Sequence, residues 1–352
     1  MRTIMAITLF ILTGILTALF FGFDFSKAAN SLEYDDEQEG MKDEIVIKFS
    51  HVAAENTPKG RAARKFASLV QERTRGKIKV QIFANGSLYN DQNEYQALLD
   101  GHVQMIAPAT SKLTKHYPKW QVLDLPFAFP TQKAVQEAYE GKIGNILLNT
   151  LDSDHVKGLT FWYNGYKQIT NDEKPIILPE DFTRMHFRIM PSPVIKSQFK
   201  MLDASTSVLP FNKVYRNLEV QFIDGEENTF SNIYTKKLYR HQKYLTISNH
   251  AYLGYVVLMN GKFWNRLSPE NKKIINQALK ETTEWNHRHS IETNDQQKRY
   301  LMKTNALKIH YLTNEEEKRW KEALGPVYHK AAPIVGKKLM NEVDRLQKKY
   351  SY

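Results

Sequence analysis

Hydrophobic residues recur at two different periods along the first part of the chain. Residues 44–51, 77–83 and 103–108 are short apolar stretches, and in the first two of them hydrophobic and polar positions alternate. This alternation predicts strands, because successive side chains of a strand point to opposite faces. Between them, hydrophobic residues recur every three or four positions over 58–75 and in the residues that end at Leu99, which predicts helices. The order strand, helix, strand, helix, strand predicts a parallel sheet covered on both faces.

The same alternation continues to the C-terminus. It predicts a helix over 132–151, strands over 156–162 and 252–260, a long helix after Ser268, a strand over 307–312 and terminal helices within 314–349. A second series of strands and helices begins near Arg188. We therefore expect an α/β protein of two lobes with a ligand cleft between them, since ligands of open parallel sheets lie at such crossings.

The lobe boundaries are predicted from the points where the chain crosses between the two series. The first crossing is placed at 163–167, before the second series begins, and the strand at 252–260 can cross back. We therefore expect lobe I to comprise 44–165 and 254–293. Lobe II is expected to comprise 166–253 and 294–352 and to include the C-terminal helices.

The start of the chain has the order of an export signal. A positively charged beginning precedes an apolar run over 4–23, and small residues occur within 26–29. The run is also long enough, at about 20 residues, to span a bilayer. Residues 1–29 are therefore predicted to be a signal peptide or an N-terminal membrane anchor, and the body lies outside the cytoplasm in either case. Residues 30–43 are polar and acidic, which predicts a spacer.

Composition favours anionic ligands and excludes several kinds of site. Lysine and arginine number 49 against 38 acidic residues, a net charge of +11. The basic residues are scattered along the predicted helices and are not interleaved with aromatic residues, so no nucleic-acid partner is predicted. The chain has no cysteine, which excludes disulfides, thiolate metal sites, a cysteine nucleophile and a lipid-anchored cysteine.

Residues 184–232 contain the main candidate for ligand binding. The predicted strand 186–189 carries Arg188 among apolar neighbours. A guanidinium on a rigid strand can hold a carboxylate or a phosphate through two parallel hydrogen bonds. The competing interpretation is a solvated strand arginine. The stretch ends in 224–228, which we interpret as an acidic turn.

The chain shows no catalytic motif. It has no P-loop, GxGxxG, GxSxG or HExxH sequence. Glu284 and His287 have the spacing of half a di-iron site, but a single copy predicts no metal centre. Asp224, Glu226 and Glu227 are interpreted as a solvated connection and not as catalytic carboxylates, because nothing nearby supplies a nucleophile or a metal partner. We therefore expect a binding protein without a cofactor or a metal.

Eight short motifs occur in the order known from one family. They are Phe49–Val52, Thr57–Gly60, Leu125–Phe127, Phe161–Lys167, Phe187–Ile189, Val214–Tyr215, Asp224–Asn228 and Ser248–Gly254. Together they make the chain resemble the extracytoplasmic solute-binding protein of tripartite ATP-independent periplasmic (TRAP) transporters, with the features of the C4-dicarboxylate-binding (DctP) branch. The resemblance covers residues 44 to about 350.

This resemblance implies a fold, a function and three ligand contacts. The fold would be a two-lobed, periplasmic-binding-protein-like clamshell with long helices linking the lobes, which closes on a small carboxylate. In that family the strand motif carries the arginine that pairs with the ligand carboxylate, here Arg188. Asn228 matches an amide that contacts the same group, and Phe211 matches an aromatic residue that packs on the ligand.

The resemblance also suggests further polar contacts. Lys167 stands where the motif NG-x-[RK] offers a second cation, and a lysine there is similar to the dicarboxylate branch and not to the sialic-acid branch. Lys59 is a candidate for the distal carboxylate, with a solvated lysine as the competing interpretation. Ser111 is a further candidate. A dianion in a cleft needs a cation near each end, because desolvation would otherwise exceed the Coulomb attraction.

These features predict a receptor that captures C4-dicarboxylates such as succinate, malate or fumarate and delivers them to a TRAP permease. Two alternatives stay open. A dicarboxylate-binding co-sensor would present its ligand to a membrane sensor kinase, and the neighbouring genes would separate this role from transport. An enzyme or isomerase on the same scaffold would have to turn over a bound dicarboxylate, although the chain lacks an activated nucleophile, a metal cluster and a nucleotide loop.

Overall fold

The computed structural model describes residues 5, 8–15, 17, 44–153, 155–304 and 306–351. The predicted spacer 30–43 and most of the predicted leader 1–29, including its cleavage point, lie outside the described residues. Of the leader, residues 8–15 are helical. None of the described helices combines the length and the apolar character needed to cross a membrane. The chain separates into units 1–44 and 45–352, and the second unit carries all elements named below.

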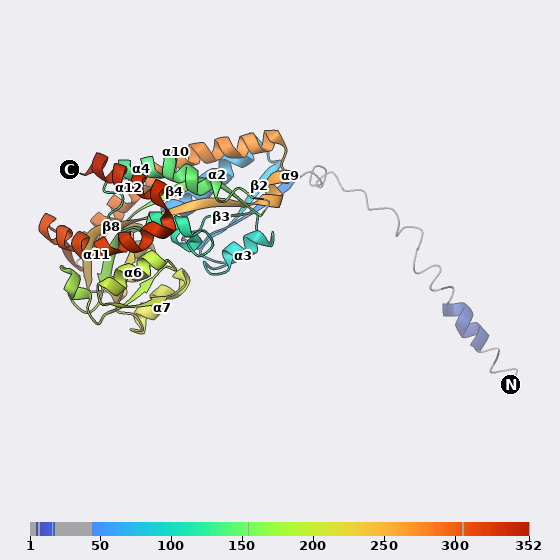
Figure 1. The fold of residues 1–352 in the computed structure, drawn as a ribbon. Helices are drawn as coiled ribbons and strands as arrows, with labels where there is room; N and C mark the ends of the chain where they lie inside the picture. Colours follow the sequence, from blue (N-terminus) through green and yellow to red (C-terminus); the bar gives the residue numbers. More distant parts are fainter. Residues whose placement is uncertain are drawn as a thin grey trace. The chain divides into compact units, whose positions relative to one another are not determined.

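Nine strands of the described body form one sheet (Figure 1). They are β1 Ile45–Ser50, β2 Ile78–Phe83, β3 Met105–Ile106, β4 Val156–Asn171, β5 His186–Ile189, β6 Ser205–Val208, β7 Gly225–Asn228, β8 Tyr244–Asn260 and β9 Lys308–Tyr311. Their order across the sheet is β2-β1-β3-β8-β4-β7-β5-β6, and β9 pairs with β8.

Parallel strands occupy the two ends of this sheet. At one end, which we call the first half, β2, β1 and β3 pair in parallel. At the other end, the second half, β6, β5 and β7 pair in parallel. The long antiparallel strands β4 and β8 join the halves, because β8 pairs with β3 and β4 pairs with β7. The predicted parallel pairing is thus found within each half, whereas the whole sheet is mixed.

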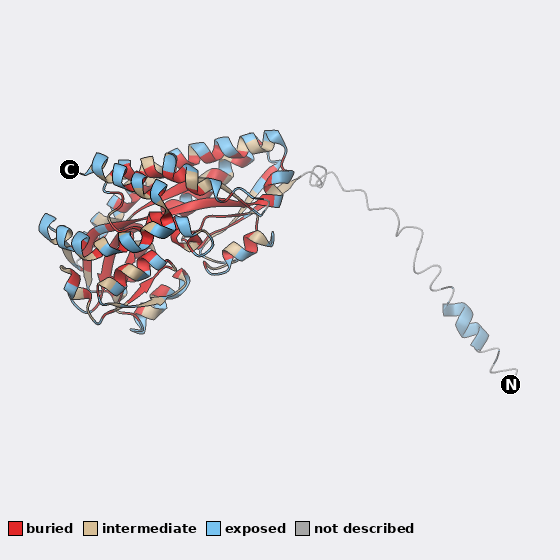
Figure 2. Cartoon of the chain, viewed as in Figure 1, coloured by how far each residue is buried: buried red, intermediate tan, exposed pale blue. Residues whose placement is uncertain are grey.

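Helices cover the sheet and turn their apolar sides towards it. Figure 2 shows buried strands beneath helices whose outer residues are exposed. The α-helices are α2 Pro58–Arg73, α3 Glu94–Leu99, α4 Gln132–Glu140, α5 Lys142–Asn149, α6 Pro193–Met201, α7 Val214–Glu219, α8 Phe230–Thr235, α9 Gly261–Arg266, α10 Pro269–Lys303, α11 Asn314–Val335 and α12 Lys337–Tyr350. Short 3-10 helices are η2 Thr110–Leu113, η3 Pro118–Asp124, η4 Pro179–Phe182, η5 Phe211–Lys213 and η6 Leu238–His241.

Two of the predicted helices begin with a residue whose side chain caps the helix. The Thr57 side chain accepts a hydrogen bond from the Gly60 backbone N–H at 3.1 Å and caps α2. Ser268 caps α10 in the same way, through the Asn271 N–H. In both helices the next residue is proline, whose missing N–H would be unpaired at this position in any case. The helix predicted to end near Arg75 and the long helix predicted after Ser268 are therefore confirmed.

The prediction of one helix over 132–151 is wrong. Gly141 separates α4 from α5 and has a non-helical conformation, with φ −98° and ψ −147°. Its N–H still donates to the Glu137 carbonyl oxygen at 2.9 Å, and a Cβ built on it would overlap that oxygen. Glycine is a poor helix former. The close approach of the Glu137 carbonyl oxygen leaves no room for a side chain at position 141.

The interpretation of 224–228 as a solvated acidic turn is also wrong. Residues Gly225–Asn228 form strand β7, and all four are buried. β7 pairs with β4 on one side and with β5 on the other. The strand therefore lies inside the sheet, and the side chains of Glu226 and Glu227 are buried and not presented to water.

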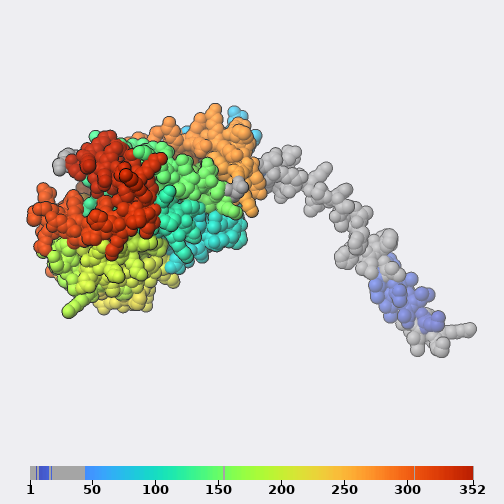
Figure 3. Space-filling model, viewed as in Figure 1, coloured from blue at the N-terminus to red at the C-terminus, as the bar shows by residue number. Residues whose placement is uncertain are grey.

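The two C-terminal helices pack against segments that are far apart in the sequence. α11 packs on α6 and η3, whereas α12 packs on α4, and Figure 3 shows the two helices lying across these neighbours. Trp320 of α11 donates from its indole N–H to the Ile177 carbonyl oxygen at 2.8 Å. Gln347 of α12 donates to the Phe127 carbonyl oxygen at 3.1 Å. The lobe bounds given above stay a prediction.

Candidate functional site

A cavity lies between the two halves of the sheet. It encloses about 470 Å³ of space not filled by protein atoms, part of which is open to solvent. Residues after β1, from α2, around the start of α3 and from η2 form one wall, and residues from β5, η5, β7 and α8 form the other. The lining residues are Val52, Ala53, Lys59, Asp91, Glu94, Ala109, Lys112, Arg188, Met190, Phe211, Glu227, Asn228, Asn232, Leu253 and Tyr255.

Arg188 reaches this cavity from β5 and is only 2% exposed. Its Nε donates to the Leu209 carbonyl oxygen at 3.1 Å. This is the only hydrogen bond that the Arg188 side chain makes to the described residues. The Phe211 ring centre lies 5.9 Å from the guanidinium carbon. Burial lowers the pKa of Arg188, while the charge of Asp91 raises it. The interpretation of Arg188 as a solvated arginine is excluded, and its terminal nitrogens stay available to a ligand.

Lys59 reaches the cavity from α2 and is 1% exposed. Its Nζ donates to the Ala107 carbonyl oxygen at 2.8 Å and lies 4.0 Å from the ring centre of Tyr255. Burial lowers the pKa of Lys59 to about 8, against the opposing effect of the Glu94 charge. No described carboxylate forms an ion pair with Lys59. A solvated lysine is therefore excluded, and the cavity holds a second cation on the wall opposite Arg188.

The third cation of the cavity wall is already compensated. Lys112 Nζ lies 2.5 Å from the Asp91 carboxylate, and both side chains are largely buried. The same carboxylate accepts a hydrogen bond from the Phe211 backbone N–H, 3.3 Å from each oxygen. Asp91 thus joins the wall that carries α3 to the wall that carries η5. Its charge is shared between a lysine and an amide.

Asn228 lines the cavity from β7 within a buried hydrogen-bond network. Its Nδ2 donates to Glu226 Oε2 at 2.9 Å, and its Oδ1 accepts from Asn232 Nδ2 at 2.7 Å. Burial raises the pKa of Glu226 to about 7, although the hydrogen bond from Asn228 opposes this. Since a primary amide has two N–H donors, Asn228 keeps one of them for a ligand.

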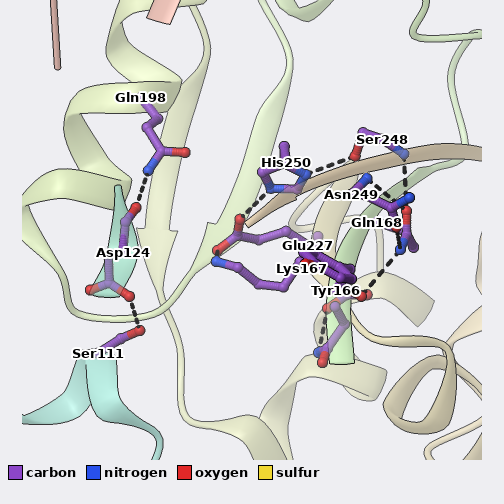
Figure 4. Close-up of polar contacts among 12 residues, drawn as sticks. Ser111, Asp124, Tyr166, Lys167, Gln168, Gln198, Glu227, Ser248, Asn249 and His250 are labelled. Carbon is purple, nitrogen blue, oxygen red and sulfur yellow. Dashed lines mark hydrogen bonds and ion pairs between the residues drawn. The ribbon is translucent and has the colours of Figure 1, made fainter. Parts of the chain in front are cut away.

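The structure does not bring Lys167 to the cavity wall. Its Nζ donates to Glu227 Oε1 at 2.7 Å, and Glu227 Oε2 lies 2.9 Å from His250 Nε2 (Figure 4). Burial alone would raise the pKa of Glu227, but Lys167 and His250 lower it to about 2. His250 Nδ1 lies 2.7 Å from Ser248 Oγ. Glu227 lines the cavity and takes up the charge of Lys167, so a direct contact between Lys167 and a ligand stays a prediction.

Ser111 also lies outside the cavity lining. Its hydroxyl donates to Asp124 Oδ1 at 2.5 Å, and the Gln198 amide donates to the Asp124 carbonyl oxygen at 2.7 Å (Figure 4). These contacts connect η2, η3 and α6. The next residue, Lys112, faces the cavity instead. A ligand contact by Ser111 stays a prediction.

Sequence reasoning missed several residues of the wall. Asp91, Glu94 and Lys112 bring three ionisable side chains into the cavity, and Tyr255 brings an aromatic face beneath Lys59. None of them lies in a motif quoted for ligand contact. The position of Lys112 directly after the candidate Ser111 is the one signal that could have directed attention to it.

A possible metal group lies elsewhere. The carboxylates of Asp172, Glu173 and Asp224 offer oxygens within 4.8 Å of one another, but none of these residues lines the cavity. One oxygen of Asp224 already accepts a hydrogen bond from the His186 backbone N–H at 2.7 Å. Exposed acidic groups of this kind are common without a metal, so no metal is assigned to it.

Comparisons with known proteins agree on one family. The sequence model described as bacterial extracellular solute-binding protein, family 7, matches residues 49–333. The C4-dicarboxylate-binding protein DctB of Bacillus subtilis is 47% identical over 348 residues, 99% of each chain. A TRAP periplasmic solute-binding protein of Shewanella oneidensis, solved with bound succinate, has a TM-score of 0.84 at 36% identity and covers 86% of this chain and 99% of its own. A counterpart from Pseudomonas aeruginosa with bound L-malate has a TM-score of 0.79 at 31% identity, over 81% and 99%.

Proposed function

The chain belongs to family 7 of the bacterial extracellular solute-binding proteins, and on this premise we propose that it captures C4-dicarboxylates in the cavity between its two halves. Family membership confirms the predictions of a two-lobed α/β fold and of a solute-binding protein that is not an enzyme. It also confirms that the protein acts outside the cytoplasm. Export by a cleaved leader, or retention by an uncleaved one, is part of the proposal.

The observation that carries the proposal is the buried guanidinium of Arg188, whose terminal nitrogens have no partner among the described residues. A planar guanidinium matches a carboxylate through two parallel hydrogen bonds. We assign one ligand carboxylate to Arg188, with the spare N–H of Asn228 beside it. The Phe211 ring, 5.9 Å from the guanidinium carbon, would pack on the short carbon chain of the ligand.

We assign the second carboxylate to Lys59. It is the other cation of the cavity that lacks a described carboxylate partner, because Lys112 is paired with Asp91. A dianion would then meet one positive charge from each wall, which offsets the cost of removing it from water. Charge-assisted hydrogen bonds contribute about 1.5–3 kcal/mol each, so several of them reach the about 8 kcal/mol of micromolar binding.

Delivery to a membrane partner completes the proposal. The matched proteins from Shewanella and Pseudomonas are described as TRAP solute-binding proteins, and we propose that this chain passes its ligand to TRAP permease subunits. The alternative of a co-sensor for a membrane kinase is not favoured by these names, which describe solute binding. Lys167 and Ser111 would then support the site from behind, through Glu227 and Asp124.

A thermal-shift screen of residues 44–352 tests the substrate class. Succinate, malate and fumarate should raise the melting temperature by several degrees at millimolar concentration, because a ligand that binds only the folded state stabilises it. Butyrate has the same carbon count as succinate and a single carboxylate, and it should have little effect. Stabilisation by sugar acids or monocarboxylates alone would contradict the proposed substrate.

A further inference from the structure

Glu94 is a carboxylic acid in the cavity wall that the proposed binding mode does not use. It is the first residue of α3 and is 1% exposed. Neither of its carboxyl oxygens has a hydrogen-bond partner among the described residues. A buried carboxylate without hydrogen bonds is far less stable than the neutral acid. The surroundings of Glu94 therefore favour the protonated form.

The charges around Glu94 come from three neighbouring elements. Lys59 of α2 favours the carboxylate, Asp91 disfavours it, and Lys112 of η2 favours it. Lys112 and Asp91 largely cancel, because they form an ion pair with each other. Burial has the largest effect and raises the pKa of Glu94 to about 7, so the group titrates in the physiological range.

Two other groups near the cavity also have a pKa close to neutral. Burial raises the pKa of Glu226, which accepts a hydrogen bond from Asn228, to about 7, and lowers the pKa of Lys59 to about 8.

His51 and Tyr255, in contrast, keep one charge state at neutral pH. Burial lowers the pKa of His51, next to the cavity residue Val52, to about 3. Burial raises the pKa of Tyr255 to about 12. Glu227 stays charged beside Lys167, and Arg188 stays a cation. Lys236, which faces Phe211 from the end of α8, is only partly buried, and burial lowers its pKa.

A charge count links Glu94 to the ligand. Lys112 with Asp91 and Lys167 with Glu227 form two neutral pairs. With the buried Glu226 in its protonated form, Arg188 and Lys59 are left for a dianion. An ionised Glu94 would cancel one of these charges and repel the ligand. Resting on the function proposed above, we infer that Glu94 is neutral in the complex, so that binding of a dicarboxylate dianion draws a proton onto Glu94 wherever the empty site holds it ionised.

This inference fixes the direction of the pH dependence. Below the pKa of Glu94 the empty site already holds the proton, and affinity does not depend on this group. Above it the proton must be taken up on binding, so affinity falls as pH rises, approaching about tenfold per pH unit. Glutamine is a neutral isostere of the protonated acid, so between about pH 6 and about pH 8 the affinity of Glu94→Gln for succinate should fall less steeply than that of the wild type.

Calorimetry measures the proton directly. Succinate is titrated at about pH 7.5 into the full binding body in two buffers with different ionisation enthalpies, and the difference in heat gives the protons taken up. The wild-type protein should take up between about one half and one proton per succinate. Glu94→Gln should take up clearly less, with any remainder coming from Lys59 and Glu226. Glu72→Gln, at an exposed position of α2, should behave like the wild type.

The outcomes separate this inference from the function on which it rests. Absence of succinate binding to the wild-type protein at every pH contradicts the proposed function. Binding without proton uptake leaves that function intact and overturns the role of Glu94. Undiminished uptake in Glu94→Gln assigns the proton to Lys59 or Glu226 and also overturns it. If Glu94→Gln fails to fold, an infrared difference spectrum of the wild-type protein decides, because succinate should increase the band of a protonated carboxylic acid.

Discussion

Lys167 and Glu227 form an ion pair that is almost fully shielded from water. Nζ lies 2.7 Å from Oε1, and each side chain is 1% exposed. Lys167 comes from β4 and Glu227 from β7, and His250 of β8 binds the other oxygen of Glu227. Three strands thus meet in one polar cluster beside the cavity. This cluster holds the Glu227 side chain in place in the cavity wall.

Replacing one partner of this pair should lower the stability of the protein more than replacing both partners together. Glu227→Gln leaves the buried ammonium of Lys167 without its counter-charge, which we expect to lower the free energy of unfolding by about 3–5 kcal/mol. The double variant Lys167→Met, Glu227→Gln removes both charges and should recover most of that loss. Urea denaturation at pH 7 of the two single variants and the double variant measures the coupling. Additive losses would contradict a strongly coupled pair.

The same pair should make the protein acid-sensitive in a defined range. The pKa of Glu227 is about 2 in the folded protein against 4.5 for an ordinary glutamate. Its contribution to stability is therefore fully present above about pH 4.5 and is lost as pH falls towards about 2. Between about pH 5 and about pH 3, the stability of Glu227→Gln should fall less steeply than that of the wild type. Equal slopes in urea denaturation would exclude Glu227 as the cause.

Lys59 should be needed for affinity. Lys59→Met keeps the length of the side chain and removes the charge assigned to the second carboxylate, so we expect succinate affinity to fall at least about tenfold. Lys119→Met, at an exposed position, is the control and should bind as the wild type does. Calorimetry on both variants measures the difference, and unchanged affinity in Lys59→Met would place the second carboxylate elsewhere.

Two glycines should respond differently to alanine. A Cβ at Gly254 would overlap the phenol of Tyr139, which is stacked on Phe161 at 4.7 Å between ring centres, so Gly254→Ala should lose about 1–3 kcal/mol of stability. Gly325 lies inside α11, where alanine is the better helix former, but it precedes Pro326, whose ring crowds a Cβ on the preceding residue in helical backbone. Gly325→Ala should therefore change stability by less than about 1 kcal/mol. Thermal unfolding checks both, and a stabilised Gly254→Ala would show that the Tyr139 ring can move aside.

The sequence predicts much of the fold because its signals are local. The period-two strands at β1 and β2 and the caps at Thr57 and Ser268 are set by neighbouring residues and are found where expected. The break at Gly141 and the strand β7 were missed for different reasons. The strand β7 depends on contacts with distant segments, because β4 and β5 pair with its two edges. The break at Gly141 is local, and the glycine itself was the signal for it.

The candidate site divides in the same way. Arg188, Lys59, Phe211 and Asn228 line the cavity as the family motifs suggested, although their contact with a ligand stays a prediction. Lys167 could be located but not its partner, because the choice of Glu227 as counter-ion follows from the pairing of β4 with β7. Residues such as Glu94 carry no local signal, since only the packing of α2 and η2 around it makes it unusual.

The central claim is that this cavity holds a C4-dicarboxylate through Arg188. The most direct test is titration calorimetry of succinate into the wild-type body and into Arg188→Ala, with Arg240→Ala, an exposed arginine of η6, as the matched control and circular dichroism to show that each variant is folded. We predict micromolar binding for the wild type and for Arg240→Ala, and no measurable heat of binding for folded Arg188→Ala. Wild-type affinity in Arg188→Ala would contradict the account.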